Sequence, residues 1–177
     1  MIKDLVLKSF FTRFTESWNI AYNDTISEAK AFEKFVNHTI LSLDDVSAFV
    51  GKSDLLDFCS PGGGNDAKLD GVGIKINGRL VGNKEDIEQI VEASKKIEVE
   101  FDLIQSKEKT DFDSAEFNTF GIGAQNFFSK PRLPESEALT QIRDLKDYIY
   151  NDMSVIRKLE DNPSVSILRV LWKCTPR

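Results

Sequence analysis

The sequence predicts an α/β domain in which a mixed β-sheet is flanked by helices. Segments with apolar residues every three or four positions occur on both sides of segments in which apolar and polar residues alternate. An Asn-Gly pair at 77–78 separates two of the alternating segments, which is the strongest short signal for a β-hairpin. The length of 177 residues suits one such domain, and 41% hydrophobic with 29% charged residues is ordinary for a globular chain.

Two amphipathic helices are predicted before the first strand. The first spans residues 2–18, and its apolar side consists of Leu5, Val6, Phe10, Phe14 and Trp18. The second spans residues 27–43, and its apolar side consists of Ala29, Phe32, Val36, Ile40 and Leu43. We therefore divide the chain into an N-terminal helix, residues 1–24, and a domain of residues 25–177.

The remaining elements follow from periodicity and from turn residues. Residues 44–59 are ambiguous between a short helix and a loop, and the Pro-Gly-Gly-Gly run at 61–64 is a strong break. Gly121 and Gly123 weaken the prediction of a helix in their segment. The predicted elements are strand 69–76, its hairpin partner 79–81, helix 85–95, strand 99–107, helix 112–128, helix 135–159 with one break, and strand 165–174.

The composition limits the classes of function. The net charge of −6 counts against nucleic-acid binding, which usually needs a basic surface, although metal sites are themselves built from carboxylates. Cys59 and Cys174 are far apart, so neither a disulfide framework nor a zinc site is indicated. We find no signal peptide and no apolar segment long enough to span a membrane, and we expect a cytoplasmic protein.

Three polar residues end apolar rows of the predicted strands. Asp70 ends the row formed by every second residue of strand 69–76, and Gln105 and Lys107 end the row of strand 99–107. Such groups are costly beside a core unless they are paired or bind a ligand. On the second helix, Glu33 lies on the apolar arc by helical phase, whereas Glu28 lies outside it. These four residues are the candidate site.

The candidate residues suit a hard divalent cation, Mg²⁺ or Mn²⁺. Asp70, Gln105 and Glu33 offer oxygen ligands, and Mg²⁺ prefers oxygen and keeps several waters. Lys107 is suited to position an attacking water or to stabilise developing negative charge. The glycines at 62–64 could let a phosphate backbone approach closely.

The same residues carry a family resemblance. Residues 64–71, GNDAKLDG, followed by Gln105-Ser106-Lys107, resemble the GDGGIDG…QxK signature of Mrr-type members of the PD-(D/E)xK nuclease superfamily. The segment 27–174 is similar to the N-terminal domain of AIPR (abortive infection phage resistance) proteins. The resemblance implies a restriction-endonuclease-like fold and a role in bacterial defence against phage. It implies Asp70 and Glu33 as metal-binding acids and Gln105 with Lys107 as the QxK pair.

The sequence departs from that signature in the loop before Asp70. The shift of residues there makes Asp66 a second candidate acid. Proteins of the AIPR family are longer, so we expect this chain to be a fragment with further domains elsewhere.

We expect a metal-dependent endonuclease that hydrolyses phosphodiester bonds, with DNA favoured over RNA. The alternative is a catalytically silent domain of the same fold that binds nucleic acid or protein, and a homodimer is left open. His38 is expected on the solvent side of its helix, and the five Phe residues between 112 and 128 are expected mainly in the core.

Overall fold

The sheet and its helices form the α/β architecture that the sequence predicts. The structure is a computed structural model that describes residues 2, 4–62, 67–107, 113–160 and 163–171. The elements within these ranges are α1 Leu5–Ser17, α2 Thr25–Leu41, α3 Ser53–Phe58, β1 Gly71–Ile76, β2 Arg79–Leu80, α4 Lys84–Ala93, β3 Val99–Lys107, α5 Ser114–Phe128, α6 Glu137–Asn151, α7 Met153–Ile156 and β4 Ser164–Leu171.

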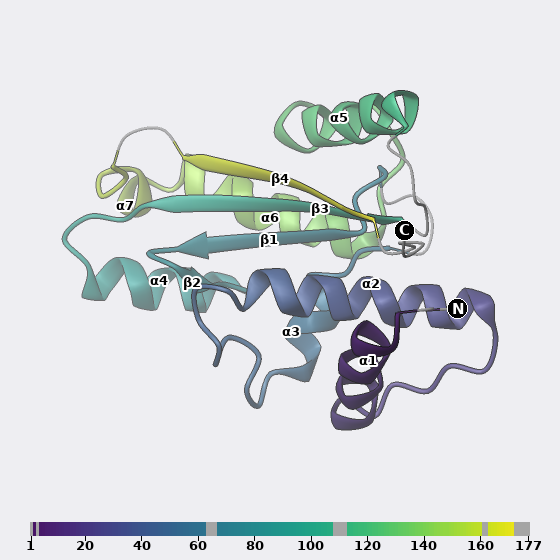
Figure 1. Cartoon of the computed structure of the whole chain (residues 1–177). Helices are drawn as coiled ribbons and strands as arrows, with labels where there is room; N and C mark the ends of the chain where they lie inside the picture. Colours follow the sequence, from purple (N-terminus) through teal and green to yellow (C-terminus); the bar gives the residue numbers. More distant parts are fainter. Residues whose placement is uncertain (1, 3, 63–66, 108–112, 161–162, 172–177) are drawn as a thin grey trace.

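The four strands are arranged in the order β2-β1-β3-β4 (Figure 1). β1 pairs antiparallel with β2 and β3, while β3 pairs in parallel with β4, so the sheet is mixed. Gly71 lies opposite Ile104, and Gln105 lies opposite Arg169. The start of β1 and the ends of β3 and β4 therefore meet at one end of the sheet.

Helices cover both faces of the sheet (Figure 1). The predicted alternation is confirmed, because every second residue of β1 and β3 enters the same core with α4, α5, α6 and α7. These strand residues are Val72, Ile74, Ile76, Val99, Phe101 and Leu103. The opposite face meets a second core, formed by α1, α2 and α3, to which β3 contributes Ile104.

The hairpin between β1 and β2 forms as predicted. Asn77 and Gly78 have φ angles of 52° and 75°, which is the left-handed pair that a two-residue hairpin turn requires. The Asn77 side chain also accepts a hydrogen bond from the Glu98 backbone N–H at 2.8 Å. This contact links the turn to the start of β3.

The predicted apolar side of α1 is wrong. Phe14 is buried as expected, but Leu5 is 81% exposed and Phe10 is 57% exposed, whereas Phe11 is 1% exposed. α1 carries two overlapping apolar rows. The aromatic side chains of α2 select the row through Phe11, whose ring lies 5.7 Å from that of Phe32.

The predicted solvent position of His38 is also wrong. Its ring lies among those of Phe14, Trp18 and Phe49, with centroid distances of 5.3, 5.3 and 5.1 Å. Two of these partners come from α1 and its C-cap, and the third comes from the loop before α3. Burial in this aromatic cluster lowers the pKa of His38.

α5 and α6 are held together by buried cations. α6 ends at Asn151 and α7 begins at Met153, which is the break predicted within segment 135–159. Arg143 and Lys146 of α6 both donate to the Phe127 carbonyl at the C-terminal end of α5, and Arg143 also pairs with Glu135. The positive side chains satisfy carbonyls that the end of a helix leaves without partners.

Gly123 of α5 should not tolerate a side chain. A Cβ there would lie 1.9 Å from the Ala67 carbonyl oxygen, whereas a Cβ at Gly121 would meet nothing within 4 Å. Gly123→Ala should lower the free energy of unfolding by about 1–3 kcal/mol, the usual cost of overpacking. Gly121→Ala should raise it by about 0.5–1 kcal/mol because alanine favours helix. Urea denaturation measures both, and equal effects at the two positions would contradict this packing.

Acid should destabilise the protein through His38. Because burial lowers the folded-state pKa of His38, the unfolded chain binds this proton at a higher pH than the folded chain. Stability should therefore fall as the pH drops below about 6.5, the ordinary histidine pKa. Urea unfolding at pH 7.5 and 5.5 should show a larger loss for the parent than for His38→Phe, which keeps an aromatic ring. The same loss in both proteins would exclude this origin.

Candidate active site

Asp70 lies at the end of the sheet where β1 begins. Its backbone N–H donates to the Ile104 carbonyl at 2.9 Å, which extends the β1–β3 pairing by one residue. Its carboxylate Oδ2 accepts the Ser106 backbone N–H at 2.9 Å and the Lys107 Nζ at 3.2 Å. The Asp70 residue is only 5% exposed, so this is a nearly buried carboxylate that Ser106 and Lys107 stabilise with charge-assisted bonds.

Lys107 reaches Asp70 from the last residue of β3. The Lys107 side chain is 30% exposed, so one side of the ion pair is open to solvent. An ammonium at this position can contact both the carboxylate and a molecule that arrives from solution. The structure thus brings together two of the residues that the sequence selected.

Gln105 lies next to Asp70 across the β1–β3 pairing. It is 2% exposed, and its Nε2 donates to the Lys68 carbonyl at 3.2 Å. Its Oε1 is buried and has no hydrogen-bond partner among the described residues. A buried acceptor of this kind is costly, so it calls for an explanation in terms of a ligand or of strain.

The segment before Asp70 adopts unusual backbone angles. Ala67 and Lys68 have φ angles of 51° and 68°, in the left-handed region that residues with a side chain seldom occupy. This conformation presents the Lys68 carbonyl to Gln105 and the Ala67 carbonyl to Gly123 of α5. Strained backbone beside polar buried residues is typical of functional sites.

Glu33 lies on α2, at the same end of the sheet. Leu41 packs over Gly73 and Asn37 packs over Gly71, so α2 runs along β1 and the length of four helical residues equals that of two strand residues. One further turn, about 6 Å, carries Glu33 beyond the start of β1. There its Oε2 lies 3.1 Å from where a Cβ on Gly62 would be, while both Glu33 and Glu28 are half-buried. Asp66 lies outside the described residues.

Two polar residues beside the site were missed by the sequence analysis. Arg169 breaks an apolar row of β4 in the way that Gln105 breaks that of β3, and this signal could have found it. Its guanidinium is buried and pairs with Glu116 at 2.6 Å and with the Asp113 carbonyl at 2.9 Å, both at the start of α5. Asn37 is the other, and its only sequence signal is that it lies one turn from Glu33.

The donor set is compatible with a sparsely liganded cation. Within the described ranges, no group of three or more His, Cys, Asp or Glu side chains is placed to hold a metal ion. Mg²⁺, however, is often held by one or two carboxylates together with waters and substrate phosphates. Asp70 and Gln105, each one residue beyond the Gly71–Ile104 pair, provide a carboxylate and an orphaned neutral oxygen at the same end of the β1–β3 pairing, which is the kind of donor set that such an ion uses.

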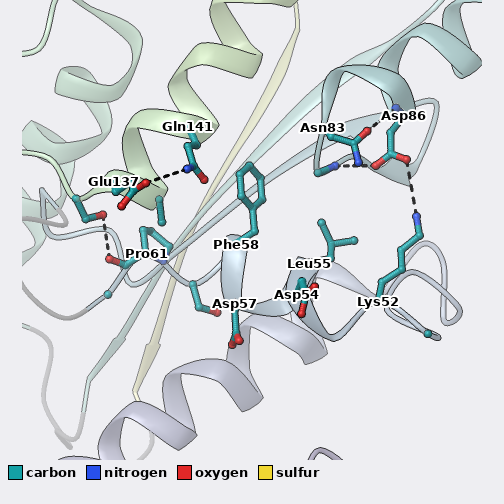
Figure 2. Close-up of a pocket in the computed structure, with 16 residues that line it drawn as sticks. Lys52, Asp54, Leu55, Asp57, Phe58, Pro61, Asn83, Asp86, Glu137 and Gln141 are labelled. Carbon is teal, nitrogen blue, oxygen red and sulfur yellow. Dashed lines mark hydrogen bonds and ion pairs between the residues drawn. The ribbon is translucent and has the colours of Figure 1, made fainter.

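A groove of about 900 Å³, which Asp70, Gln105 and Lys107 do not line, lies between α3, the loop before α4 and the start of α6 (Figure 2). Its walls carry Asp54, Asp57, Asp86 and Glu137, with Lys52 pointing toward Asp86 at 4.0 Å. An acidic wall repels a polyanion, so we do not place nucleic acid in this groove.

Cys59 and part of the predicted Phe cluster belong to the protein core. Cys59 is buried, and burial raises the pKa of its thiol to about 12, which makes it a poor nucleophile. Of the predicted Phe cluster, Phe120 and Phe127 are fully buried and Phe117 and Phe128 are partly exposed. Cys174 and Phe112 lie outside the described residues.

No family model, curated protein or solved structure matches this chain. Among the described residues, no helix is long and apolar enough to cross a membrane.

Proposed function

We propose that this domain is a divalent-metal-dependent nuclease of the restriction-endonuclease-like class that hydrolyses phosphodiester bonds in DNA. The observation that carries the proposal is the convergence of Asp70, Lys107 and the orphaned Gln105 carboxamide at one end of the sheet. The resemblance of residues 64–71 and 105–107 to the Mrr-type signature, and of segment 27–174 to AIPR proteins, extends the proposal to a role in defence against phage.

Each residue has a distinct task in this proposal. Asp70 and Gln105 would hold Mg²⁺ or Mn²⁺, and Glu33 would contribute directly or through a water from the α2 side. Bound Mg²⁺ would act as a Lewis acid on the phosphate and lower the pKa of a bound water. Lys107 orients the attacking water and stabilises the negative charge that develops on the phosphate.

The acidic net charge of the chain makes DNA binding depend on the charges close to the site. The chain carries −6 overall, so attraction of a polyanion depends on local cations and on the metal ion itself. The cations nearest the candidate site in sequence and sheet register are exposed Lys68, Lys107, which pairs with Asp70, and buried Arg169, which pairs with Glu116. The alternative function is a catalytically silent domain of the same fold that binds nucleic acid or protein, and the net charge of −6 favours it over a domain that cleaves DNA.

Removal of Lys107 should separate cleavage from metal binding. Lys107→Met should reduce Mn²⁺-dependent cleavage of plasmid DNA at least about a hundredfold, as loss of a transition-state donor does elsewhere. Mn²⁺ affinity should be equal or higher, because a competing cation has left Asp70. Gel assays and calorimetric titration measure the two effects.

The matched control for Lys107 is Lys96→Met. Lys96 is also paired with a carboxylate, Glu160, at 2.9 Å, but it precedes β3 at the opposite end of the sheet. This variant should cleave as the parent does. If the parent cleaves neither DNA nor RNA with Mn²⁺, the nuclease proposal fails and the silent domain is the better interpretation.

Asp70→Asn should abolish Mn²⁺ binding while the domain stays folded. The amide keeps an oxygen that can accept the Ser106 N–H, so the local structure is retained while the anionic ligand is lost. The control is Asp102→Asn, another buried aspartate, which pairs with Lys75 at 2.9 Å on the opposite face of β3. That change should lower the melting temperature, because it removes one charge of a buried pair.

The two aspartate variants give opposite signatures. We expect Asp102→Asn to bind Mn²⁺ as the parent does, and Asp70→Asn to melt near the parent but bind no Mn²⁺. Unchanged Mn²⁺ affinity of Asp70→Asn in calorimetry would show that Asp70 is not a ligand.

A further inference from the structure

Asn37 joins α2 to the backbone of the candidate site. Its side chain is fully buried, at 0% exposure, in a helix where neighbouring inward residues are apolar. Its Nδ2 donates to the Asp70 carbonyl at 2.9 Å and to the Ser60 Oγ at 3.0 Å. One amide therefore connects α2 with Ser60, just after α3, and with Asp70, the proposed metal-binding residue.

The orientation of this amide follows from its partners. The Asp70 carbonyl only accepts hydrogen bonds, so the NH₂ group of Asn37 must face it, and Oδ1 must face the other way. Oδ1 is then buried without a hydrogen-bond partner among the described residues. An unsatisfied buried acceptor costs about 1–3 kcal/mol, so the amide is a poor choice for packing alone.

Gly71 makes this contact possible. A Cβ at position 71 would lie 2.1 Å from the Asn37 Oδ1, so only glycine lets the Asn37 side chain lie against the strand here. The close approach brings α2 onto β1 immediately after Asp70. Because Glu33 is one turn away on the same helix, the contact also sets how far α2 extends beyond the sheet toward Gly62.

We infer that Asn37 is a positioning residue that holds Asp70, and through α2 Glu33, in the arrangement that binds the metal ion. The inference rests on the proposed function. Asn37 touches the Asp70 backbone and acts through it, so its role is to fix where the Asp70 carboxylate points. The Ser106 N–H, which donates to that carboxylate, reports this directly and without any metal.

The test compares Asn37→Ala and Asn37→Leu with the control Asn126→Ala in the same chain. Asn126 is also buried and makes three side-chain hydrogen bonds, but in the α5–α6 connection. Leucine has the same branched shape and number of side-chain heavy atoms as asparagine and removes the orphaned Oδ1, so Asn37→Leu keeps the core filled. The readouts are Mn²⁺ affinity by calorimetry and amide hydrogen exchange at Ser106, both well below the melting temperature.

We expect both Asn37 variants to weaken Mn²⁺ binding about 10–100-fold, the usual effect of losing a partner that orients a ligand. We also expect Ser106 to exchange at least about tenfold faster relative to the core amides. Asn126→Ala should lower the melting temperature and leave both readouts unchanged. A merely structural role would move the melting temperature alone.

One result would overturn the inference about Asn37, and another would overturn the proposed function. Unchanged Mn²⁺ affinity and unchanged Ser106 exchange in folded Asn37→Leu would overturn the inference. If the parent binds no Mn²⁺, the proposed function fails, and Ser106 exchange then decides about Asn37 separately. Faster exchange in the Asn37 variants would still show that Asn37 positions Asp70, and unchanged exchange would refute it.

Discussion

The buried carboxylate of Asp70 is the constraint around which this end of the molecule is arranged. It lies beyond the last regular pair of β1 and β3, and it accepts the Ser106 N–H and the Lys107 ammonium from the neighbouring strand. A charge with so little exposure to water needs such partners, because desolvation without them is costly. The Ser106 amide and Lys107 therefore stabilise the polar end of this otherwise apolar pair of strands.

Close backbone approaches connect this carboxylate to helices on both faces of the sheet. Gly71 admits Asn37 of α2 from one side, and Gly123 of α5 lies against the Ala67 carbonyl on the other side. Between them, the left-handed backbone at Ala67 and Lys68 directs a carbonyl to Gln105. The missing Cβ leaves room for the Asn37 side chain at Gly71 and for the Ala67 carbonyl at Gly123. The site is thus defined by two helices and the sheet together, and by no single segment.

The charge distribution separates the candidate site from the groove beside α3. Four carboxylates line the groove, and its cation Lys52 is drawn to Asp86. At the sheet end, Lys107 pairs with the nearly buried Asp70, and Arg169 of the next strand pairs with Glu116. The groove therefore carries an excess of negative charge, whereas the charges at the sheet end are arranged in pairs. The net charge of −6 opposes the approach of a polyanion at long range.

The sequence by itself determined the elements and the faces of the strands. The hairpin at Asn77-Gly78, the span of β3, and the common face of Asp70, Gln105 and Lys107 follow from φ preferences and from the two-residue period of a strand. These are short-range properties of the backbone, so local pattern is sufficient to predict them.

Only the tertiary structure decided which of several possible surfaces is buried and which distant groups meet. α1 has two apolar rows, and its packing against α2 buries Phe11 and exposes Leu5 and Phe10. His38 was predicted in solvent and lies in an aromatic cluster, because side chains from α1 and from the loop before α3 close over it. The contact of Asn37 with the Asp70 carbonyl spans 33 residues and depends on how α2 lies across β1. Periodicity describes one element at a time, and the distances between elements are set by their mutual packing.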